Sequence, residues 1–503
     1  MRIVVVGSGF GGLAAAIRLQ AQGHDVTIVE KLDKAGGRAY VFEQDGFTFD
    51  AGPTIITAPW LIHELFELAG RKTDDYVQLV LLDPFYNVRF EDGSVFHYNA
   101  DRDALIRQVR EFSPDDVDGY LRLVERGKEI FRAGMALIDK PFHTPWSMLS
   151  VVPDLVRLRA DRSVADYAAG FLKDERLRQV FSFHPLLVGG NPFRASSIYA
   201  LIHTLEQQWG VWFAMGGTGA LVRALVQLFE DLGGTIRFES EVAEILVTPG
   251  SRKAAGVRLV HGERIASDAV VCNGDVAQAY RTLVPASARP SMSDRRIARY
   301  RYSMSLFVIY FGTNRQYEHV AHHEILMGPR YRELLEDIFE RKILADDFSL
   351  YLHRPTATDP SLAPPGHDSW YVLSPVPHLG GNVNWDVVSE RYRDRIMAYL
   401  EERYLPGLSQ HIVSERRIDP RYFETTLNSY LGSAFGPEPT LTQSAYWRPH
   451  NVSPDIPNLF FCGAGTHPGA GIPGVISSGK IVADLIGGTG TLRRAKTASI
   501  VEL

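Results

Sequence analysis

The sequence predicts an α/β fold with a Rossmann-like domain that is assembled from separate stretches of the chain. Three observations lead to this prediction. A strand pattern, a glycine-rich turn and a helix pattern follow one another at the N-terminus, helices and strands alternate again after residue 212, and a strand–glycine–helix pattern returns near residue 460. Strands that alternate with helices are typical of a parallel sheet with helices on its faces.

The N-terminal pattern begins with residues 3–6, which are β-favouring apolar residues suited to a strand buried on both faces. The segment GSGFGG follows at residues 7–12, and the helix after it ends at Gly23, which suits a helix C-terminus. Residues 26–29 then form a second predicted strand that is closed by Glu30. This order of strand, glycine turn, helix, strand and acid is the full context of a dinucleotide-binding site.

Each residue of this motif has a physical task. Gly7 permits the tight turn, Gly9 lets the backbone approach a pyrophosphate, and Gly12 lets the helix pack closely on the strand. The N-terminus of the helix offers free N–H groups and a positive dipole end to phosphates. Glu30 suits an acceptor for ribose hydroxyls, and its charge disfavours a 2′-phosphate. NAD and FAD both satisfy this pattern.

A second glycine motif, Gly36-Gly37-Arg38, lies shortly after Glu30 and is followed by the segment FTFDAGPT at residues 47–54. Two adjacent glycines and an arginine suit a second anion contact beneath an extended cofactor. With this motif the sequence resembles the superfamily of flavin-containing monoamine oxidases and carotenoid desaturases, in which the GGR segment approaches the phosphate and sugar region of the flavin. The resemblance therefore implies FAD.

A third motif occupies residues 463–475 and contains five glycines and two prolines in thirteen residues, just before a predicted helix. A surface with so few side chains suits a flat aromatic ring that lies close to backbone, with helix N–H groups near its developing negative charge. The stretch is similar to the signature of bacterial-type phytoene desaturases. The similarity extends to residues 36–54, 181–198, 209–219, 328–334 and 432–450, and so covers essentially the chain through about residue 485.

The resemblance implies an activity: FAD-dependent desaturation of phytoene in carotenoid biosynthesis. An acyclic C40 polyene would lose hydride from allylic CH2–CH2 units to flavin N5 over several steps, giving neurosporene or lycopene, with quinone or dioxygen as the final electron acceptor. The residues expected at the flavin are Gly7, Ser8, Gly9, Phe10, Gly11, Gly12, Glu30, Lys31, Gly36, Gly37, Arg38, Pro53, Thr54, Val242, Asp275, Gly463, Gly471, Ile472 and Val475.

No residue is assigned as the catalytic base, because loss of hydride leaves an allylic cation whose adjacent C–H is strongly acidic. His184 and His467 are the weak candidates for proton transfer, each set against an ordinary buried histidine. Asp50 is expected to fix the turn at Gly52 and Pro53 rather than to catalyse. The histidine-rich residues 319–324 are expected to form a solvated loop, and no metal site is predicted.

The organisation along the chain predicts three regions. Residues 1–85, 213–290 and 440–503 are expected to form the discontinuous FAD-binding domain. Residues 86–212 are expected to be a mainly helical region that contacts substrate and membrane, and residues 291–439 a sheet-containing substrate-binding domain. Residues 303–311 are predicted to be a buried strand of this last domain.

The composition narrows the partners and the compartment. The net charge of 53 − 59 = −6 argues against a nucleic-acid binder, and two cysteines favour the reduced cytoplasmic side. The longest apolar run, residues 306–311, is far short of the roughly 20 residues of a membrane span, and no signal peptide is expected. A C40 hydrocarbon resides in lipid, however, so peripheral membrane association is expected.

Two segments are the candidates for that membrane contact, each set against an ordinary core helix or solvated face. Residues 142–160 combine aromatic and aliphatic side chains with two arginines, which suits an interfacial helix. The second is a basic cluster of Arg289, Arg295, Arg296, Arg299 and Arg301 with Asp294 as the opposing charge.

Alternative activities stay open at this point. They include a related carotenoid desaturase of the hydroxyneurosporene or dehydrosqualene type, a ketolase-like relative, a flavin-dependent carotenoid cis–trans isomerase, and a carotenoid-binding protein with a structural flavin. The mass of the product separates desaturation from isomerisation or binding.

Overall fold

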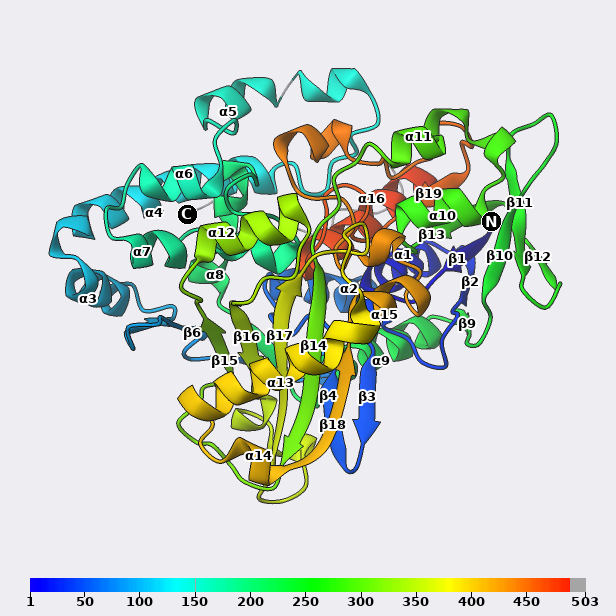
Figure 1. The fold of residues 1–503 in the computed structure, drawn as a ribbon. Helices are drawn as coiled ribbons and strands as arrows, with labels where there is room; N and C mark the ends of the chain where they lie inside the picture. Colours follow the sequence, from blue (N-terminus) through cyan, green and yellow to red (C-terminus); the bar gives the residue numbers. More distant parts are fainter. Residues whose placement is uncertain (150, 489–503) are drawn as a thin grey trace.

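The computed structural model describes residues 1–149 and 151–488, and has two main sheets joined by a helical region (Figure 1). The first is a five-stranded parallel sheet of order β19-β13-β1-β2-β9. Its strands are β1 (Arg2–Val6), β2 (Asp25–Val29), β9 (Thr235–Arg237), β13 (Ala269–Cys272) and β19 (Leu459–Phe461). Three separated stretches of the chain therefore build one parallel sheet, and the predicted α/β class is confirmed.

Alternate residues of these strands point to opposite faces of the sheet, and each face has its own apolar core. Ile3 and Val5 pack with α1 (Phe10–Ala21), α9 (Thr218–Asp231) and α16 (Ile472–Gly487). Val4 packs on the other side with α10 (Val276–Leu283) and a three-stranded antiparallel sheet. That small sheet consists of β10 (Val242–Val247), β11 (Ala254–Leu259) and β12 (Arg264–Ala266).

The second main sheet has seven strands in the order β18-β14-β17-β16-β15-β6-β7. All its pairings are antiparallel except that of β15 with β6. Its strands are β6 (Tyr86–Arg89), β7 (Val95–Tyr98), β14 (Ser305–Thr313), β15 (His323–Leu326), β16 (Leu350–His353), β17 (Asp368–Val376) and β18 (Ile412–Ile418). The predicted buried strand is confirmed as β14, in which every residue is buried.

Two expectations about this sheet are wrong. Residues 86–98 lie in the region expected to be mainly helical, but they form β6 and β7, because β6 pairs with β15 and β7 pairs with β6 at the edge of the sheet. Residues 319–324 were expected to be a solvated loop, yet His322, His323 and Glu324 are buried and β15 begins at His323. Buried polar side chains on a strand need partners, and a single sequence does not show them.

Helices dominate the stretch between β7 and β8 (Trp212–Ala214). They are α3 (Arg102–Phe112), α4 (Val117–Met135), α5 (Val152–Arg157), α6 (Val164–Ala169), α7 (Glu175–Val180) and α8 (Leu201–Trp209). Residues 142–160 do not form the single helix that was expected. They form a short 3-10 turn, Pro145–Met148, and the six-residue α5, because Pro153 lacks an N–H donor and disfavours helical backbone before it.

The remaining elements connect these layers. They are the hairpin β3 (Val41–Gln44) and β4 (Phe47–Asp50), α2 (Pro59–Leu68), β5 (Leu79–Leu81), α11 (Asp294–Ile297), α12 (Tyr331–Glu336), α13 (Trp385–Arg403), α14 (Leu408–His411) and α15 (Pro420–Thr425). Helix α13 packs on one face of the seven-stranded sheet, at Phe307 and Ile309. Among residues 1–149 and 151–488, no helix is long and apolar enough to cross a membrane.

Candidate functional site

A single cavity of about 610 Å³ extends from the parallel sheet to the seven-stranded sheet. Val6, Val29 and Asn273 line it, and each lies at or just beyond the carboxyl end of a parallel strand. In open α/β sheets, ligands bind at this edge. The position of the cavity therefore follows from the strand order.

The glycine turn between β1 and α1 leaves no room for side chains. A Cβ atom on Gly9 would lie 2.8 Å from Nδ2 of Asn273, and one on Gly11 would lie 2.9 Å from the backbone nitrogen of Gly463. Gly7 has a φ of +92°, which favours glycine. Gly7 and Gly9 line the cavity together with Ser8, Phe10 and Gly11.

Gly12 has a different task, because it is absent from the cavity wall. A Cβ atom on Gly12 would lie 2.2 Å from the carbonyl oxygen of Gly7. The residue therefore permits the close packing of α1 on the turn, as its place in the motif predicts.

Glu30 lines the cavity at the end of β2, where it also fixes the glycine turn. Its carboxylate accepts hydrogen bonds from the backbone N–H of Ser8 at 2.8 Å, from the Ser8 hydroxyl at 2.6 Å and from the N–H of Leu32 at 2.9 Å. A carboxylate offers about four acceptor positions. One position is thus left for a hydroxyl in the cavity, while the others hold the turn.

Arg38 offers an unsatisfied donor to the cavity. Its Nη2 donates to the hydroxyl of Ser429 at 2.8 Å, and its guanidinium lies 4.0 Å from the carboxylate of Asp275, which caps α10. Its Nε is buried, and no described protein atom accepts a hydrogen bond from it. Gly36 and Gly37 line the wall beside it, with φ values of +125° and +57°.

The cavity also reaches β10 and α15. Val242, at the start of β10, lines the cavity. Lys31 lines it too, and its Nζ donates to the carbonyl of Thr425 and to Oδ1 of Asn428, both at 3.1 Å. Several polar residues beside them belong to no motif, so the sequence alone gives no sign of them. They are Ser240, Glu241, Asn273, Gln278, Thr282 and Asn428.

The C-terminal glycine loop forms the wall where the two sheets approach each other. Gly463, Gly471, Ile472 and Val475 all line the cavity, and α16 begins directly after Gly471. The loop is held by the fully buried Arg448, a residue that the sequence analysis missed. Its guanidinium donates to the carbonyls of two loop residues, Thr466 at 2.9 Å and Ala464 at 2.6 Å, and to the carbonyl of Pro437, outside the loop, at 3.1 Å.

These features fit FAD. Glycine backbone at the cavity wall admits a diphosphate, and the N-termini of α1 and α16 carry the positive ends of two helix dipoles. The buried Nε of Arg38 is a donor that lacks an acceptor, and a phosphate oxygen would provide one. Pro53 and Thr54 extend the same wall toward the second sheet.

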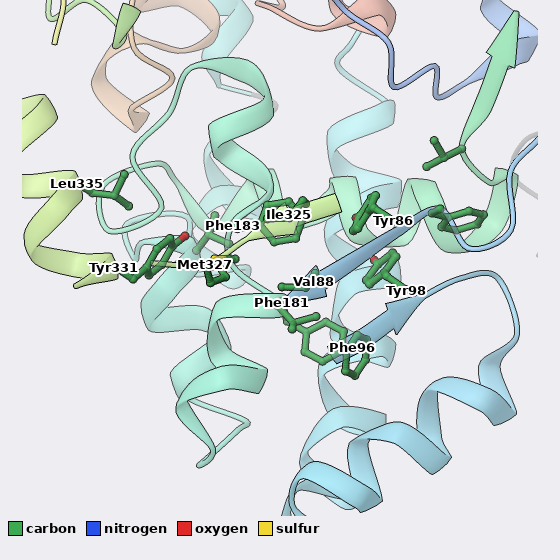
Figure 2. Packing of buried hydrophobic residues seen from close by; sticks show 14 of the residues in the cluster. Tyr86, Val88, Phe96, Tyr98, Phe181, Phe183, Ile325, Met327, Tyr331 and Leu335 are labelled. Carbon is green, nitrogen blue, oxygen red and sulfur yellow. The ribbon is translucent and has the colours of Figure 1, made fainter. Parts of the chain in front are cut away.

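Beyond Thr54 the cavity becomes apolar. Figure 2 shows Ile325 of β15 and Met327, just after this strand, beside Phe183 and Tyr331, and all four line the cavity. Further apolar lining residues come from the 3-10 turn His184–Val188, from β14 and the residue before it, from β17, and from the segment before α6. They are Leu186, Leu187, Met304, Leu306, Val308, Leu373, Met148, Val151 and Leu155. The far end of the site therefore accepts an extended hydrocarbon.

A group of hydroxyls lies where the glycine-lined part meets the apolar part. Oγ1 of Thr54 is 2.6 Å from the hydroxyl of Tyr371 and 3.0 Å from that of Tyr351. The Tyr351 hydroxyl is also 2.7 Å from Nδ1 of His323. Thr54 was predicted at the flavin, but the two tyrosines carry no local signal, since they come from β16 and β17.

The two weak candidates for proton transfer lie in different places. His184 is buried outside the cavity wall, with Nε2 3.1 Å from the Tyr86 hydroxyl and 3.3 Å from the Glu206 carboxylate. His467 lines the cavity, and its Nε2 lies 3.1 Å from the carbonyl oxygen of Leu137. Burial lowers the pKa of His467 to about 4, so its ring is neutral at physiological pH.

Asp50 does not fix the turn at Gly52 and Pro53, as was expected. Its carboxylate accepts hydrogen bonds from the backbone N–H groups of Thr218 at 2.9 Å and Gly219 at 3.2 Å, at the start of α9. Desolvation by burial raises the pKa of Asp50 to about 6, although these hydrogen bonds oppose the shift. The residue joins the β3–β4 hairpin to a helix of the parallel-sheet domain.

The histidine-rich segment meets a third histidine in the fold. Ligand nitrogens of His322, His323 and His353 lie within 4.8 Å of one another, and all three rings are buried. Burial and the nearby Arg354 guanidinium lower the pKa of His322 to about 3. The positive charge of Arg354 disfavours the binding of a metal cation between these three histidines.

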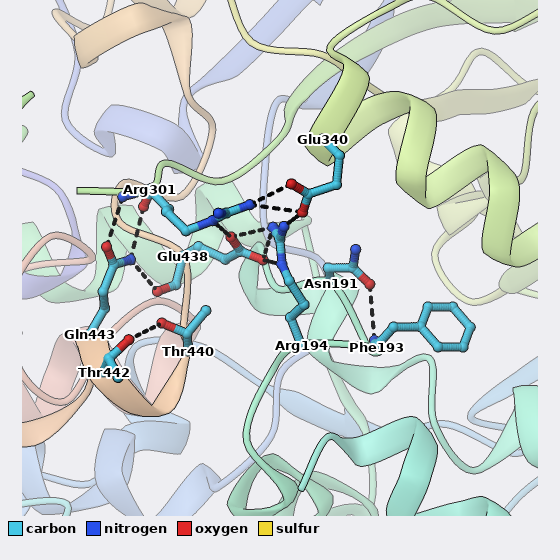
Figure 3. Close-up of polar contacts among 9 residues, drawn as sticks. All are labelled: Asn191, Phe193, Arg194, Arg301, Glu340, Glu438, Thr440, Thr442 and Gln443. Carbon is cyan, nitrogen blue, oxygen red and sulfur yellow. Dashed lines mark hydrogen bonds and ion pairs between the residues drawn. The ribbon is translucent and has the colours of Figure 1, made fainter. Parts of the chain in front are cut away.

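In the basic cluster of residues 289–301, a candidate membrane contact, some arginines form ion pairs with acidic residues of the protein itself. Arg289 is buried and donates to Asp294 at 2.9 Å. Arg301 donates to Glu340 at 2.7 Å and lies 3.6 Å from Glu438, so Asp294 is not the sole opposing charge (Figure 3). Arg295 and Arg296 of α11 keep exposed positions.

Comparison with known proteins agrees with this geometry. The family described as flavin containing amine oxidoreductase matches residues 10–487. The chain is 51% identical to the lycopene-forming phytoene desaturase of Pantoea ananas, over 96% of this chain and 98% of the relative. It is 43% identical to the neurosporene-forming phytoene desaturase of Rhodobacter capsulatus, over 96% of this chain and 94% of the relative.

Among solved structures, cyclohexylamine oxidase from Brevibacterium oxydans matches with a TM-score of 0.61 at 16% identity, and covers 97% of this chain and 98% of its own. This likeness supports the fold alone. The identities to the two desaturases extend over nearly the whole chain, as the resemblance of the motifs predicted. The chain therefore belongs to the flavin-containing amine oxidoreductase family, and within it to the bacterial-type phytoene desaturases.

Proposed function

We propose that this protein is an FAD-dependent oxidoreductase that desaturates phytoene in carotenoid biosynthesis. The observation that carries the proposal is the continuity of one cavity, whose glycine-lined part fits a dinucleotide and whose other part is apolar. An elongated hydrocarbon can thereby approach the far end of the cofactor. The two desaturases, at 51% and 43% identity, have the same activity in their names.

When bound, FAD supplies a hydride acceptor for the allylic CH2–CH2 units of the polyene. The protein's own residues hold and surround the reactants. The glycine turn, Glu30 and Arg38 fix one end of the cofactor, and the loop held by Arg448 supports the other. Apolar walls such as Ile325 and Met327 exclude water from the reacting carbons.

Lycopene is the product we propose, because the identity is higher with the lycopene-forming relative than with the neurosporene-forming one. The test is anaerobic incubation of the FAD-loaded protein with phytoene in liposomes, with and without a quinone. Each desaturation lowers the mass of the polyene by two hydrogens, so mass spectrometry counts the steps. An unchanged mass would instead indicate isomerisation or binding and would contradict the proposal.

The same experiment identifies the electron acceptor, which we propose to be a membrane quinone rather than dioxygen. A lipid-soluble oxidant can reach the site by the route that the polyene takes. Product that accumulates beyond one turnover only when quinone is present supports this choice. Equal turnover with dioxygen alone would contradict it.

We further propose that the protein binds peripherally to the cytoplasmic side of the membrane, through a patch at the mouth of the cavity. The support is that the same short segments contribute cavity-lining and exposed apolar residues. Met148, Val151 and Leu155 line the cavity, while the neighbouring Trp146 and Leu149 are 76% and 65% exposed. Apolar side chains exposed beside a cavity mouth can enter the lipid and admit a hydrocarbon.

Two further segments extend this patch, which lies on the upper side of the molecule in Figure 1. Trp447 is 46% exposed, lines the cavity, and follows Ala445 and Tyr446, which pack against Phe142 and Met148. Helix α11, with Arg295 and Arg296, is drawn on the same upper side. Arginines beside an apolar patch favour anionic headgroups.

The test of this contact is co-sedimentation with anionic liposomes. Replacing both Trp146 and Leu149 by Asp should lower the bound fraction at least about ten-fold, because two charges would enter the interface. The control is Val387→Asp, since Val387 is 70% exposed on α13, away from the cavity. Equal binding by the double variant and the control would reject this segment as the contact.

A further inference from the structure

A chain of hydrogen-bonding groups leads from the cavity into the interior of the seven-stranded sheet. It begins at Thr54 and Tyr371, passes through the hydroxyl of Tyr351, and continues to Nδ1 of His323 at 2.7 Å. Nδ1 of His353 lies a further 3.1 Å away. Thr54, Tyr351 and Tyr371 line the cavity, whereas both histidines are buried behind them.

The directions of these hydrogen bonds follow from the chemistry of the groups. Burial raises the pKa of both Tyr351 and Tyr371, so both phenols keep their protons and act as donors. Tyr371 can donate to Thr54, and Thr54 can donate to Tyr351. The proton of Tyr351 then points to Nδ1 of His323, which is closer than Thr54 and is a better acceptor than an alcohol.

The two histidines form a site for one additional proton. Burial lowers the pKa of His323 and of His353, so both rings are neutral in the resting protein. Their Nδ1 atoms lie 3.1 Å apart, and neither Nε2 has a partner among the described residues. With the proton of each neutral ring on Nε2, Nδ1 of His323 accepts from Tyr351, and the two Nδ1 atoms become hydrogen-bonded to each other only when an additional proton arrives. A proton that reaches His323 can therefore be shared between two nitrogens in the interior.

Among the residues that the structure describes, no other group combines these features. His184 lies outside the cavity wall, and its ring is engaged with Tyr86 and Glu206. His467 lines the cavity, and its Nδ1 has no partner among the described residues, which makes it the strongest competitor. The test below therefore includes His467.

We propose that Tyr351 is the catalytic residue that takes the proton from the polyene, and that His323 and His353 receive the proton that Tyr351 gives up. This proposal rests on the desaturation proposed above. In each step, one carbon of the polyene loses a hydride to the flavin, so the polyene is oxidised by two electrons and the flavin is reduced. The C–H bond of the neighbouring carbon then breaks, its electron pair forms the new double bond, and its proton goes to the Tyr351 oxygen while the hydroxyl proton moves to Nδ1 of His323.

A weak base is sufficient for this transfer, because the polyene carries a positive charge when its proton leaves. The hydrogen beside an allylic cation is far more acidic than an imidazolium ion, even one whose charge is disfavoured by burial. A phenol that donates to an imidazole can therefore accept the proton in the same motion. General-base assistance of this kind contributes roughly 10²–10⁴-fold to the rate.

The first test is Tyr351→Phe, measured as anaerobic single-turnover oxidation of phytoene. We expect the rate to fall about 100-fold while FAD binding is retained. Phytoene deuterated at the carbon that loses the proton should show an isotope effect near unity in the wild type and a clear one in the variant, because proton loss becomes limiting. The matched control is Tyr310→Phe, since Tyr310 lies on β14 of the same sheet, separated from β16 by β17, and donates to the carbonyl of Ala51 instead.

The isotope pattern distinguishes the competing residues. A deuterium isotope effect on proton loss that appears in His467→Asn but not in Tyr351→Phe would overturn the proposal and indicate His467 as the proton acceptor. If Tyr351→Phe is as fast as Tyr310→Phe, it is overturned outright. A wild type that leaves the polyene mass unchanged would instead overturn the desaturation itself, so the two failures are separable.

A second measurement is independent of turnover. In protein labelled with ¹⁵N-histidine, Nδ1 of His323 should give the signal of an unprotonated, hydrogen-bonded nitrogen, assigned by its loss in His323→Gln. The signal should shift in Tyr351→Phe and stay in place in Tyr310→Phe. A proton on Nδ1 of His323 in the resting protein would contradict the relay, since His323 could then accept nothing from Tyr351.

Discussion

The two ends of the cavity are built in different ways. At the dinucleotide end, the important residues follow their strands directly, as Gly7 follows β1 and Glu30 follows β2. At the apolar end, the polar groups of the wall meet from distant positions, with Thr54 against Tyr351 and Tyr371. The first arrangement is local and can be recognised in a sequence. The second exists only after the seven-stranded sheet has formed.

This difference teaches where to look for each kind of function in the chain. Cofactor binding depends on backbone that follows a strand, so glycine spacing records it. Proton transfer depends on side chains brought together across strands, so spacing records nothing. The following predictions test whether the two ends respond as differently as this comparison requires.

The largest effect is expected from Gly12→Val at the local end. The new Cβ would lie 2.2 Å from the carbonyl oxygen of Gly7, so helix and turn must separate. We expect FAD affinity, measured by fluorescence titration, to fall by about 3 kcal/mol, or roughly 100-fold. Gly170→Ala is the control, because its Cβ would come no closer than 3.3 Å to another atom. Unchanged affinity in Gly12→Val would break the comparison.

An intermediate effect is expected from Glu438→Gln, in an ion-pair cluster outside the cavity wall that is likewise assembled from distant parts of the chain. Glu438 is fully buried and accepts three hydrogen bonds from Arg194, at 2.6, 2.7 and 3.2 Å, while Arg301 lies 3.6 Å away (Figure 3). Loss of its charge leaves two arginines without their buried partner. Because both arginines are partly exposed, we expect a loss of about 2–3 kcal/mol in the free energy of unfolding.

Glu340→Gln is the matched control for that measurement by urea denaturation. Glu340 contacts the same Arg194 and Arg301 but its side chain is 43% exposed, so its removal should cost less than about 1 kcal/mol. Equal losses in the two variants would show that burial does not determine the strength of this network.

Asp50→Asn changes the contact between the β3–β4 hairpin and α9, and should give the smallest effect. The pKa of Asp50 is about 6 in the folded protein against an ordinary value of 3.8. Between these values the folded state holds the proton that the unfolded state has lost, so the wild type loses stability as pH rises from about 4 to 6. Asn keeps an acceptor for Thr218 and does not titrate.

The variant should therefore gain stability over the wild type across this range. The hydrogen bonds of a neutral amide to Thr218 and Gly219 are weaker than those of the carboxylate and offset part of the gain, which leaves about 1 kcal/mol above pH 7. Thermal denaturation at pH 4.5 and pH 8 measures the difference. The stability difference, variant minus wild type, should be more positive at pH 8 than at pH 4.5. The opposite order would show that the hydrogen bonds to Thr218 and Gly219 outweigh the cost of burying the charge.

Much of the dinucleotide end could be predicted from the sequence. The strands at residues 3–6 and 26–29, the helix between them and the loop at 463–475 all lie where their patterns placed them. The errors lie where residues meet across the fold. Residues 86–98 were read as part of a helical region because their partner strand, β15, is more than 200 residues away.

The segment 142–160 illustrates the same limit. Its apolar residues were identified, yet the sequence could not divide them into those that line the cavity, such as Met148, and those that are exposed, such as Trp146. That division depends on which side of a short turn faces the protein. Pro145 and Pro153 are the local signals that the segment is broken.

The sequence by itself determined the glycine turns, the acid at Glu30 and the family, because each depends on residues that are close together in the chain. Only the tertiary structure decided that Tyr351, His323 and Thr54 share a hydrogen-bonded chain, and that Asp50 holds α9. Backbone approach to a phosphate requires glycine at fixed spacing. A contact between side chains of different strands requires only that the strands pair, and many residue types allow that.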